Sequence, residues 1–138
     1  MSSKEDRYSI AIEAIIDASE RNESGIPILV EGRRDRDMLV RLGFKGIIEL
    51  LNRGKPVDEV VIFLIEKYST QVEILMDWDR TGGRLQRKIM DAFSSLDRPA
   101  IDELHSTLRK VLKPDTRCVE SIPNEIVNSI SEGQHRIP

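Results

Sequence analysis

Residues 72–83, VEILMDWDRTGG, begin as a short apolar strand and end in a glycine pair that can open a helix. Alternate residues of a strand point to the same side, about 6.5 Å apart. Asp77 and Asp79 are therefore predicted to face one object, while Trp78 faces away and fills the core. A buried strand that ends in two carboxylates and then turns at Gly82 and Gly83 predicts a polar site at the edge of a sheet.

The size and composition of the chain predict one globular domain. It has 138 residues, of which 39% are hydrophobic and 33% charged, enough for a full core. The longest apolar run, residues 60–65, is far too short to cross a bilayer, and residues 1–6 lack the apolar stretch of a secretion signal. A single cysteine, Cys118, excludes an internal disulfide. We therefore expect a cytoplasmic protein without a membrane partner.

Charge is unevenly distributed along the chain. A net charge of −3 argues against a general nucleic-acid coat. Two basic groups nevertheless follow residues 31 and 79: Arg33, Arg34, Arg36 and Arg41 in the first, and Arg80, Arg84, Arg87 and Lys88 in the second. Such groups could hold phosphates beside an acidic site, or could be no more than the solvated faces of helices.

Hydrophobic spacing predicts alternating helices and strands. Helical spacing extends over residues 4–21, 34–42, 57–68, 81–94, 101–112 and 123–130. Short apolar runs predict strands over residues 26–30, 46–51 and 72–76, with a fourth over residues 116–122. The predicted fold is α/β, a three-layer, doubly wound, Rossmann-like sheet of about four parallel strands. An added N-terminal helix within residues 1–25 is expected to pack on the domain of residues 26–138, covering the sheet or forming a homodimer interface.

Acidic residues close two of the predicted strands. Ligands of open parallel sheets bind beyond the carboxyl ends of the strands, so Glu31, Asp77 and Asp79 would meet there if the first and third strands are neighbours. Two carboxylates about 4 Å apart repel by roughly 4 kcal/mol at an effective dielectric near 20. Three of them need a shared proton or a cation, and oxygen ligands suit Mg²⁺ or Mn²⁺. The sequence therefore predicts a metal site made by these three residues.

Each motif also has a simpler structural explanation. A Glu-Gly pair after a strand is common. An aspartate at a strand-to-helix turn is most often a helix cap, which Asp79 could be for the helix over residues 81–94. The two motifs together, each at the end of an apolar strand and separated by one βα unit, are much less expected by chance.

Residues 28–35, ILVEGRRD, and residues 74–82, ILMDWDRTG, resemble the Toprim domain of topoisomerases, primases and related nucleases. The resemblance covers about residues 26–95. The chain looks most like the small stand-alone Toprim proteins of archaea, and its motif spacing is similar to that of the Toprim ribonuclease that matures ribosomal RNA. The resemblance implies a four-stranded parallel sheet with adjacent first and third strands. It also implies that Glu31 is a general acid or base at a phosphodiester and that Asp77 and Asp79 bind Mg²⁺.

The chain lacks parts that some members of that family need. A topoisomerase needs a nucleophilic tyrosine in a separate domain, and Tyr8 and Tyr68 look like helix-face residues instead. Primases need zinc-binding and polymerase parts. The expected function is therefore Mg²⁺-dependent phosphodiester chemistry on nucleic acid, RNA or DNA, by a nuclease-like or processing enzyme. The expected phosphate contacts are the glycines and arginines beside the acids: Gly32, Arg33, Arg34, Arg80, Gly82, Gly83 and Arg84.

Two other functions fit parts of the same sequence. A non-catalytic nucleic-acid- or protein-binding adaptor would keep the metal site as a residual or structural feature. A haloacid-dehalogenase-like phosphatase would use Asp77 as its nucleophile, but such enzymes normally carry this residue on the first strand and need paired acids downstream. Of the remaining polar residues, His105 is expected on the surface and Cys118 in the fourth strand.

Overall fold

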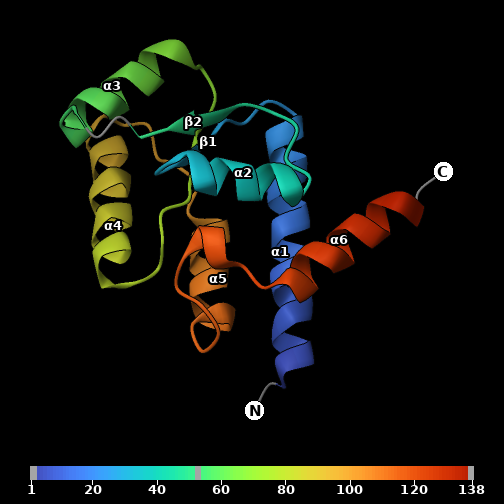
Figure 1. Cartoon of the computed structure of the whole chain (residues 1–138). Helices are drawn as coiled ribbons and strands as arrows, with labels where there is room; N and C mark the ends of the chain where they lie inside the picture. Colours follow the sequence, from blue (N-terminus) through green and yellow to red (C-terminus); the bar gives the residue numbers. More distant parts are fainter. Residues whose placement is uncertain (1–2, 52–53, 137–138) are drawn as a thin grey trace.

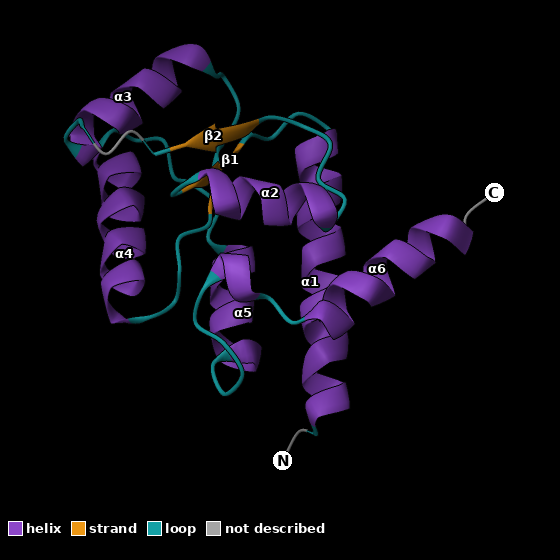
Figure 2. Ribbon diagram, in the orientation of Figure 1, coloured by secondary structure: helices purple, strands orange, loops and turns teal. Residues whose placement is uncertain are grey.

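The fold is known from a computed structural model that describes residues 3–51 and 54–136. Its elements in chain order are α1 (Lys4–Glu23), β1 (Ile28–Val30), α2 (Arg33–Arg41), β2 (Ile48–Leu50), α3 (Val57–Lys67), β3 (Glu73–Ile74), α4 (Arg80–Ser95), α5 (Glu103–Leu112), the 3₁₀ helix η1 (Val119–Ser121) and α6 (Asn124–Arg136). A small sheet lies among these helices (Figures 1 and 2). The chain is therefore α/β, as predicted. Within the described ranges, none of the helices has both the length and the apolar character needed to span a bilayer.

In the part of the chain that the structure describes, three short parallel strands form the sheet, in the order β2-β1-β3. Ile28 of β1 pairs with Ile48 of β2 on one side and with Glu73 of β3 on the other. β1 is therefore central, and the first and third strands are neighbours, as the predicted site requires. Their carboxyl ends lie at one edge of the sheet, where open parallel sheets bind ligands.

The fourth strand predicted over residues 116–122 is wrong. Val119 and Ile122 are both buried, and their spacing of three is the repeat of the 3₁₀ helix η1 rather than of a strand. The place beside β3 is taken by Ile101, whose N–H donates to the carbonyl of Val72 at 2.9 Å. The Ile101 carbonyl accepts from the N–H of Ile74 at 3.0 Å. The helix predicted over residues 101–112 therefore begins only at Glu103, because Ile101 belongs to the edge of the sheet.

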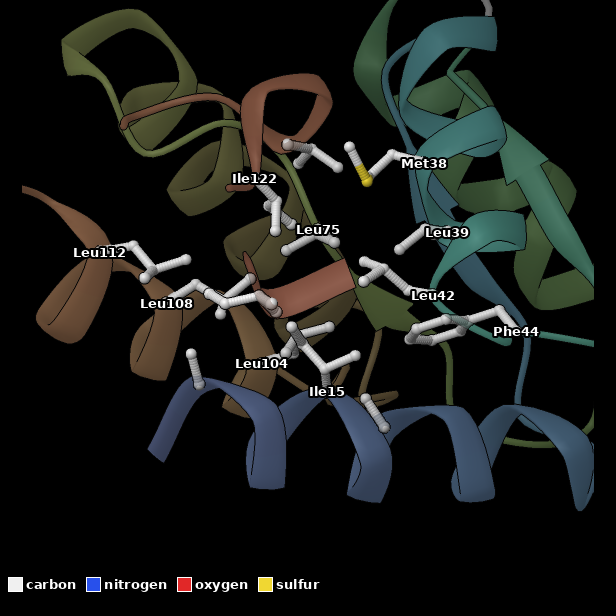
Figure 3. Packing of buried hydrophobic residues seen from close by; sticks show 14 of the residues in the cluster. Ile15, Met38, Leu39, Leu42, Phe44, Leu75, Leu104, Leu108, Leu112 and Ile122 are labelled. Carbon is white, nitrogen blue, oxygen red and sulfur yellow. The ribbon is translucent and has the colours of Figure 1, made fainter. Parts of the chain in front are cut away.

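Helices cover both faces of the sheet. Ile28 and Val30 pack into a cluster with α1, α2 and α5, and the intervening Leu29 packs on the opposite face with α3 and α4. In Figure 3, Leu75 and Leu104 of the first cluster lie between α1 and the side chains of α2. Burial on both faces explains why β1 is a continuous apolar run in the sequence. The result is a three-layer arrangement with the sheet in the middle.

Helix α1 is tied to the sheet by a buried ion pair. Its buried residues face α5 and α6. In its last turn, Arg21 donates to both carboxylate oxygens of Glu73 in β3, from Nη2 at 2.8 Å and from Nε at 3.1 Å. Glu73 is only 1% exposed. This bidentate contact compensates the charge of an otherwise buried carboxylate.

Replacing Arg21 with Met should therefore lower the free energy of unfolding by about 3 kcal/mol, because Glu73 would keep a buried charge without its guanidinium partner. Urea unfolding measures this change. The matched control is Lys4→Met, which breaks an exposed pair with Glu125 and should change stability far less. Equal effects of the two variants would show that the buried pair does not anchor α1.

Candidate metal centre

Acidic side chains converge where β1 and β3 end. Glu31 directly follows β1, Asp77 and Asp79 follow β3, and Asp35 lies in the first turn of α2. The pKa of Asp77 is raised to about 6, first by burial and then by the charges of Asp35, Asp79 and Glu31. The backbone hydrogen bond from Val119 opposes this rise. The structure thus gathers the acids from two separate stretches of the chain, residues 31–35 and 77–79.

Asp77 is held at both its carboxylate and its carbonyl. The N–H of Val119 donates to Oδ1 of Asp77 at 2.9 Å. Nε2 of His105 lies 3.1 Å from the carbonyl oxygen of Asp77, and because a carbonyl only accepts, this nitrogen carries the proton. Burial lowers the pKa of His105, which favours its neutral form. The prediction that His105 lies on the surface is wrong, since the residue is 4% exposed.

The segment that precedes η1 is brought to the site by Trp78. Its backbone N–H donates to the carbonyl of Arg117 at 2.9 Å, and its indole Nε1 donates to the carbonyl of Thr116 at 2.7 Å. The prediction that Trp78 fills the core is confirmed, because it is 4% exposed and belongs to the main apolar cluster. These two bonds place Cys118 and Val119 beside Asp77. The prediction that Cys118 lies in a strand is therefore wrong. The residue lies next to the acids instead.

Asp79 is a helix cap as well as a site residue. Its Oδ1 accepts from the N–H of Gly82 at 2.7 Å, at the start of α4. Its other oxygen, Oδ2, makes no hydrogen bond or ion pair with any residue that the structure describes, and neither does Oδ2 of Asp77. The two explanations offered by the sequence are therefore compatible: one oxygen caps the helix and the other can bind a ligand.

Gly82 permits the close approach of α4 to Asp77. A Cβ at this position would lie 2.6 Å from the carbonyl carbon of Asp77 and 2.8 Å from its Cβ, so the backbone would have to shift to admit one. A Cβ at Gly83 would meet nothing within 4 Å. The close approach that the structure shows at Gly82 is thus to the backbone of Asp77. Of the two glycines, Gly83 is the one that borders open space.

The donor atoms at this site fit a divalent cation. Ligand atoms of Asp77, Asp79 and Cys118 all lie within 4.8 Å of one another. Burial and the nearby carboxylates raise the pKa of the Cys118 thiol, and since the thiolate is the form that binds metals, the carboxylate oxygens are the stronger donors. Hard oxygen donors favour ions such as Mg²⁺ or Mn²⁺. Glu31 is outside this group, although its charge acts on Asp77.

Two hollows border the acids and divide the predicted phosphate contacts between them. The first has a volume of about 620 Å³ and is lined by Glu31, Gly32, Arg33, Arg34, Asp35, Leu50, Leu51, Gly54 and Glu120. The second has a volume of about 600 Å³ and is lined by Trp78, Asp79, Arg80, Gly83, Arg84, Arg87, Lys88, Asp91, Arg109, Lys113 and Arg117. The predicted contacts Gly32, Arg33 and Arg34 therefore belong to one side of the site, and Arg80, Gly83 and Arg84 to the other.

The chain is similar to several archaeal proteins. It is 32% identical to a UPF0292 protein of Methanosarcina acetivorans over 110 residues, which cover 80% of this chain and 75% of that protein. It is 31% identical to a UPF0292 protein of Thermoplasma volcanium over 112 residues, covering 81% of this chain and 92% of that protein. A solved structure described as a putative protein from Aquifex aeolicus superposes with a TM-score of 0.61 at 30% identity, covering 83% of this chain and 96% of that one. No family model matches the chain.

The contact between Gly82 and Asp77 predicts opposite effects for two neighbouring substitutions. Gly82→Ala should lower the free energy of unfolding by about 1–3 kcal/mol, because the added methyl group meets rigid backbone. Gly83→Ala should raise it by up to about 1 kcal/mol, since alanine favours a helix and finds open space. Urea unfolding measures both changes. A Gly82→Ala protein as stable as the wild type would contradict the close approach.

The raised pKa of Asp77 predicts a specific pH dependence of stability. In the unfolded chain this carboxyl titrates near 3.8, and in the fold near 6, so the metal-free protein should lose stability as pH rises between these values. Asp77→Asn keeps an oxygen for the N–H of Val119 but cannot ionise. In the presence of a chelator, its melting temperature should lack this fall and exceed that of the wild type at pH 8. If the melting temperatures of the two proteins change with pH in the same way, the crowding of charge at Asp77 is refuted.

Proposed function

The chain belongs to the UPF0292 family, and we propose that it is a Toprim-like enzyme that carries out metal-dependent phosphodiester chemistry on nucleic acid. One observation carries this proposal: Asp77 and Asp79 meet beside Glu31 at the carboxyl ends of two adjacent parallel strands. Carboxylates crowded in this way, with a pKa raised by burial and like charge, are typical of functional sites. The order of the Glu-Gly and Asp-x-Asp-x-x-Gly motifs along the chain supports the Toprim-like assignment.

Asp77 and Asp79 would hold Mg²⁺ or Mn²⁺ through their Oδ2 atoms. When bound, such an ion supplies positive charge that polarises a phosphate oxygen and offsets the charge that develops during cleavage. The protein contributes fixed donors, because the N–H of Val119 and the N–H of Gly82 already orient the two carboxylates. Binding therefore requires little rearrangement of the ligands.

Glu31 is the proposed general acid or base. It lies outside the group of ligand atoms, but it follows β1 at the sheet edge where Asp77 follows the adjacent β3, and its charge acts on Asp77. Its carboxylate would accept a proton from the attacking hydroxyl or water, or donate one to the leaving oxygen. A place beside the ligands, rather than among them, suits a residue whose task is to move a proton.

Arginines on both sides of the acids support a polyanionic substrate. Arg33 and Arg34 line the hollow next to Glu31, while Arg80 and Arg84 line the hollow next to Asp79. A single small phosphate ester would need cations on one side only. A nucleic-acid strand that crosses the site would meet both groups, because it carries a phosphate at every nucleotide.

The proposal predicts that purified protein with Mg²⁺ or Mn²⁺ cleaves at least one member of a panel of single- and double-stranded RNA and DNA. Glu31→Gln should lower the rate by about 100-fold or more while leaving metal affinity nearly unchanged, since a general acid or base is worth that much. Gel electrophoresis measures cleavage. Metal binding is measured by the rise in stability, which amounts to about 2.7 kcal/mol at 100 times the dissociation constant.

Asp79→Asn is the matched control, because asparagine also caps helices and so keeps the fold while losing the charged ligand. It should lose both metal stabilisation and cleavage. If the wild type shows no metal stabilisation and cleaves nothing, the enzymatic proposal fails. If it binds metal and nucleic acid but cleaves nothing, the adaptor function is correct.

A further inference from the structure

The hollow next to Asp79 is strongly cationic. It lies between α4 and α5, and we call it the α4–α5 groove. Seven basic residues line it: Arg80, Arg84, Arg87, Lys88, Arg109, Lys113 and Arg117. Among the lining residues that the structure describes, only two are acids, Asp79 and Asp91. The groove is therefore a concentration of positive charge on a chain whose net charge is −3.

These cations are not used to hold the fold together. Within the described residues, the side chains of the seven make no hydrogen bond or ion pair, whereas Arg7, Arg21 and Lys67 elsewhere each pair with an acid. Side-by-side cations without partners repel one another and lower stability. A ligand that carries several negative charges would relieve this repulsion.

Most of the cations line the groove from two elements, α4 and the end of α5. On α4, Arg80, Arg84 and Lys88 follow one another at intervals of four residues, so they lie on one face and span about 12 Å along the helix axis. Arg109 of α5 and Lys113, which directly follows that helix, have the same spacing. A smaller hollow of about 200 Å³, which shares Gly83, Arg87 and Arg109 with the groove, continues it between the same two helices. The charged surface is thus elongated rather than a point.

We infer that the α4–α5 groove binds the phosphate backbone of a single-stranded nucleic acid and leads it to Asp79. This inference deepens the proposed function by naming the substrate class and its path. One strand lying in the groove can contact the cations of α4 and those at the end of α5 together. A duplex is wider and would touch only the rims, and a single phosphate would neutralise only one or two of the charges. Because Asp79 lines the groove, a strand lying in it reaches the metal ligands.

The test is a binding experiment in the presence of a chelator, with a labelled single-stranded oligonucleotide of mixed sequence. Arg109→Ala combined with Lys113→Ala should weaken binding about tenfold or more. The double substitution should also reduce the slope of log affinity against log salt concentration by about 1.4, since each phosphate contact to a single strand contributes about 0.7. The control is Lys45→Ala combined with Lys110→Ala, which removes two exposed lysines outside the groove. Circular dichroism establishes that both variants are folded.

Selective weakening by the groove substitutions supports the inference, and equal weakening by both double variants overturns it. A duplex of the same sequence that binds as tightly as the single strand also overturns it. So does inorganic pyrophosphate that competes as well as the oligonucleotide. The outcome is separable from that of the enzymatic proposal, because binding is measured without metal: a groove that binds strands in a protein that never cleaves them leaves this inference intact.

Discussion

The parallel pairing of β1 with β3 is the contact on which the candidate site depends. Ile28 pairs with Glu73 and Leu29 with Ile74, and the N–H of Leu75 continues the ladder to the carbonyl of Leu29 at 2.9 Å. Both faces of these strands are buried, so a slip of one residue would turn each apolar side chain to the wrong face. The apolar core therefore determines the register. That register in turn decides that the residue after β1 and the residues after β3 emerge at the same edge.

Charge crowding at this edge opposes folding, and the surrounding structure compensates for it. Asp77 is half-buried near three other carboxylates, which raise its pKa together with burial. The fold keeps it there through the N–H of Val119, the contact of His105 with its carbonyl, and the absence of a side chain at Gly82. These contacts hold the carboxylates in place against their mutual repulsion, and a cation bound there, as proposed, would meet ligands that need not move. This explains how a stable protein can retain an arrangement that is unfavourable without a ligand.

The two sides of the site differ in character. On the side of Glu31, the hollow mixes acids, arginines and the apolar Leu50 and Leu51. On the side of Asp79, cations from α4, from α5 and from the segment after it predominate. A chemical step near Glu31 and a binding surface beyond Asp79 would then be separate parts of one path, joined at the carboxylates. The negative net charge of the chain conceals this division, because it sums over the whole surface.

The sequence alone determined the local features: the apolar strands β1 and β3, the acids that follow them, the cap at Asp79 and most helices. These features could be predicted because periodicity, capping and turn preferences act over a few residues. Only the tertiary structure decided that Ile101 occupies the sheet edge beside β3, that residues 119–121 form a 3₁₀ helix, and that His105 and Cys118 lie beside Asp77. Val119 and His105 contact Asp77 across 42 and 28 residues of chain. Contacts at such separations arise from packing of the whole core, which leaves no periodic pattern in the segments that make them.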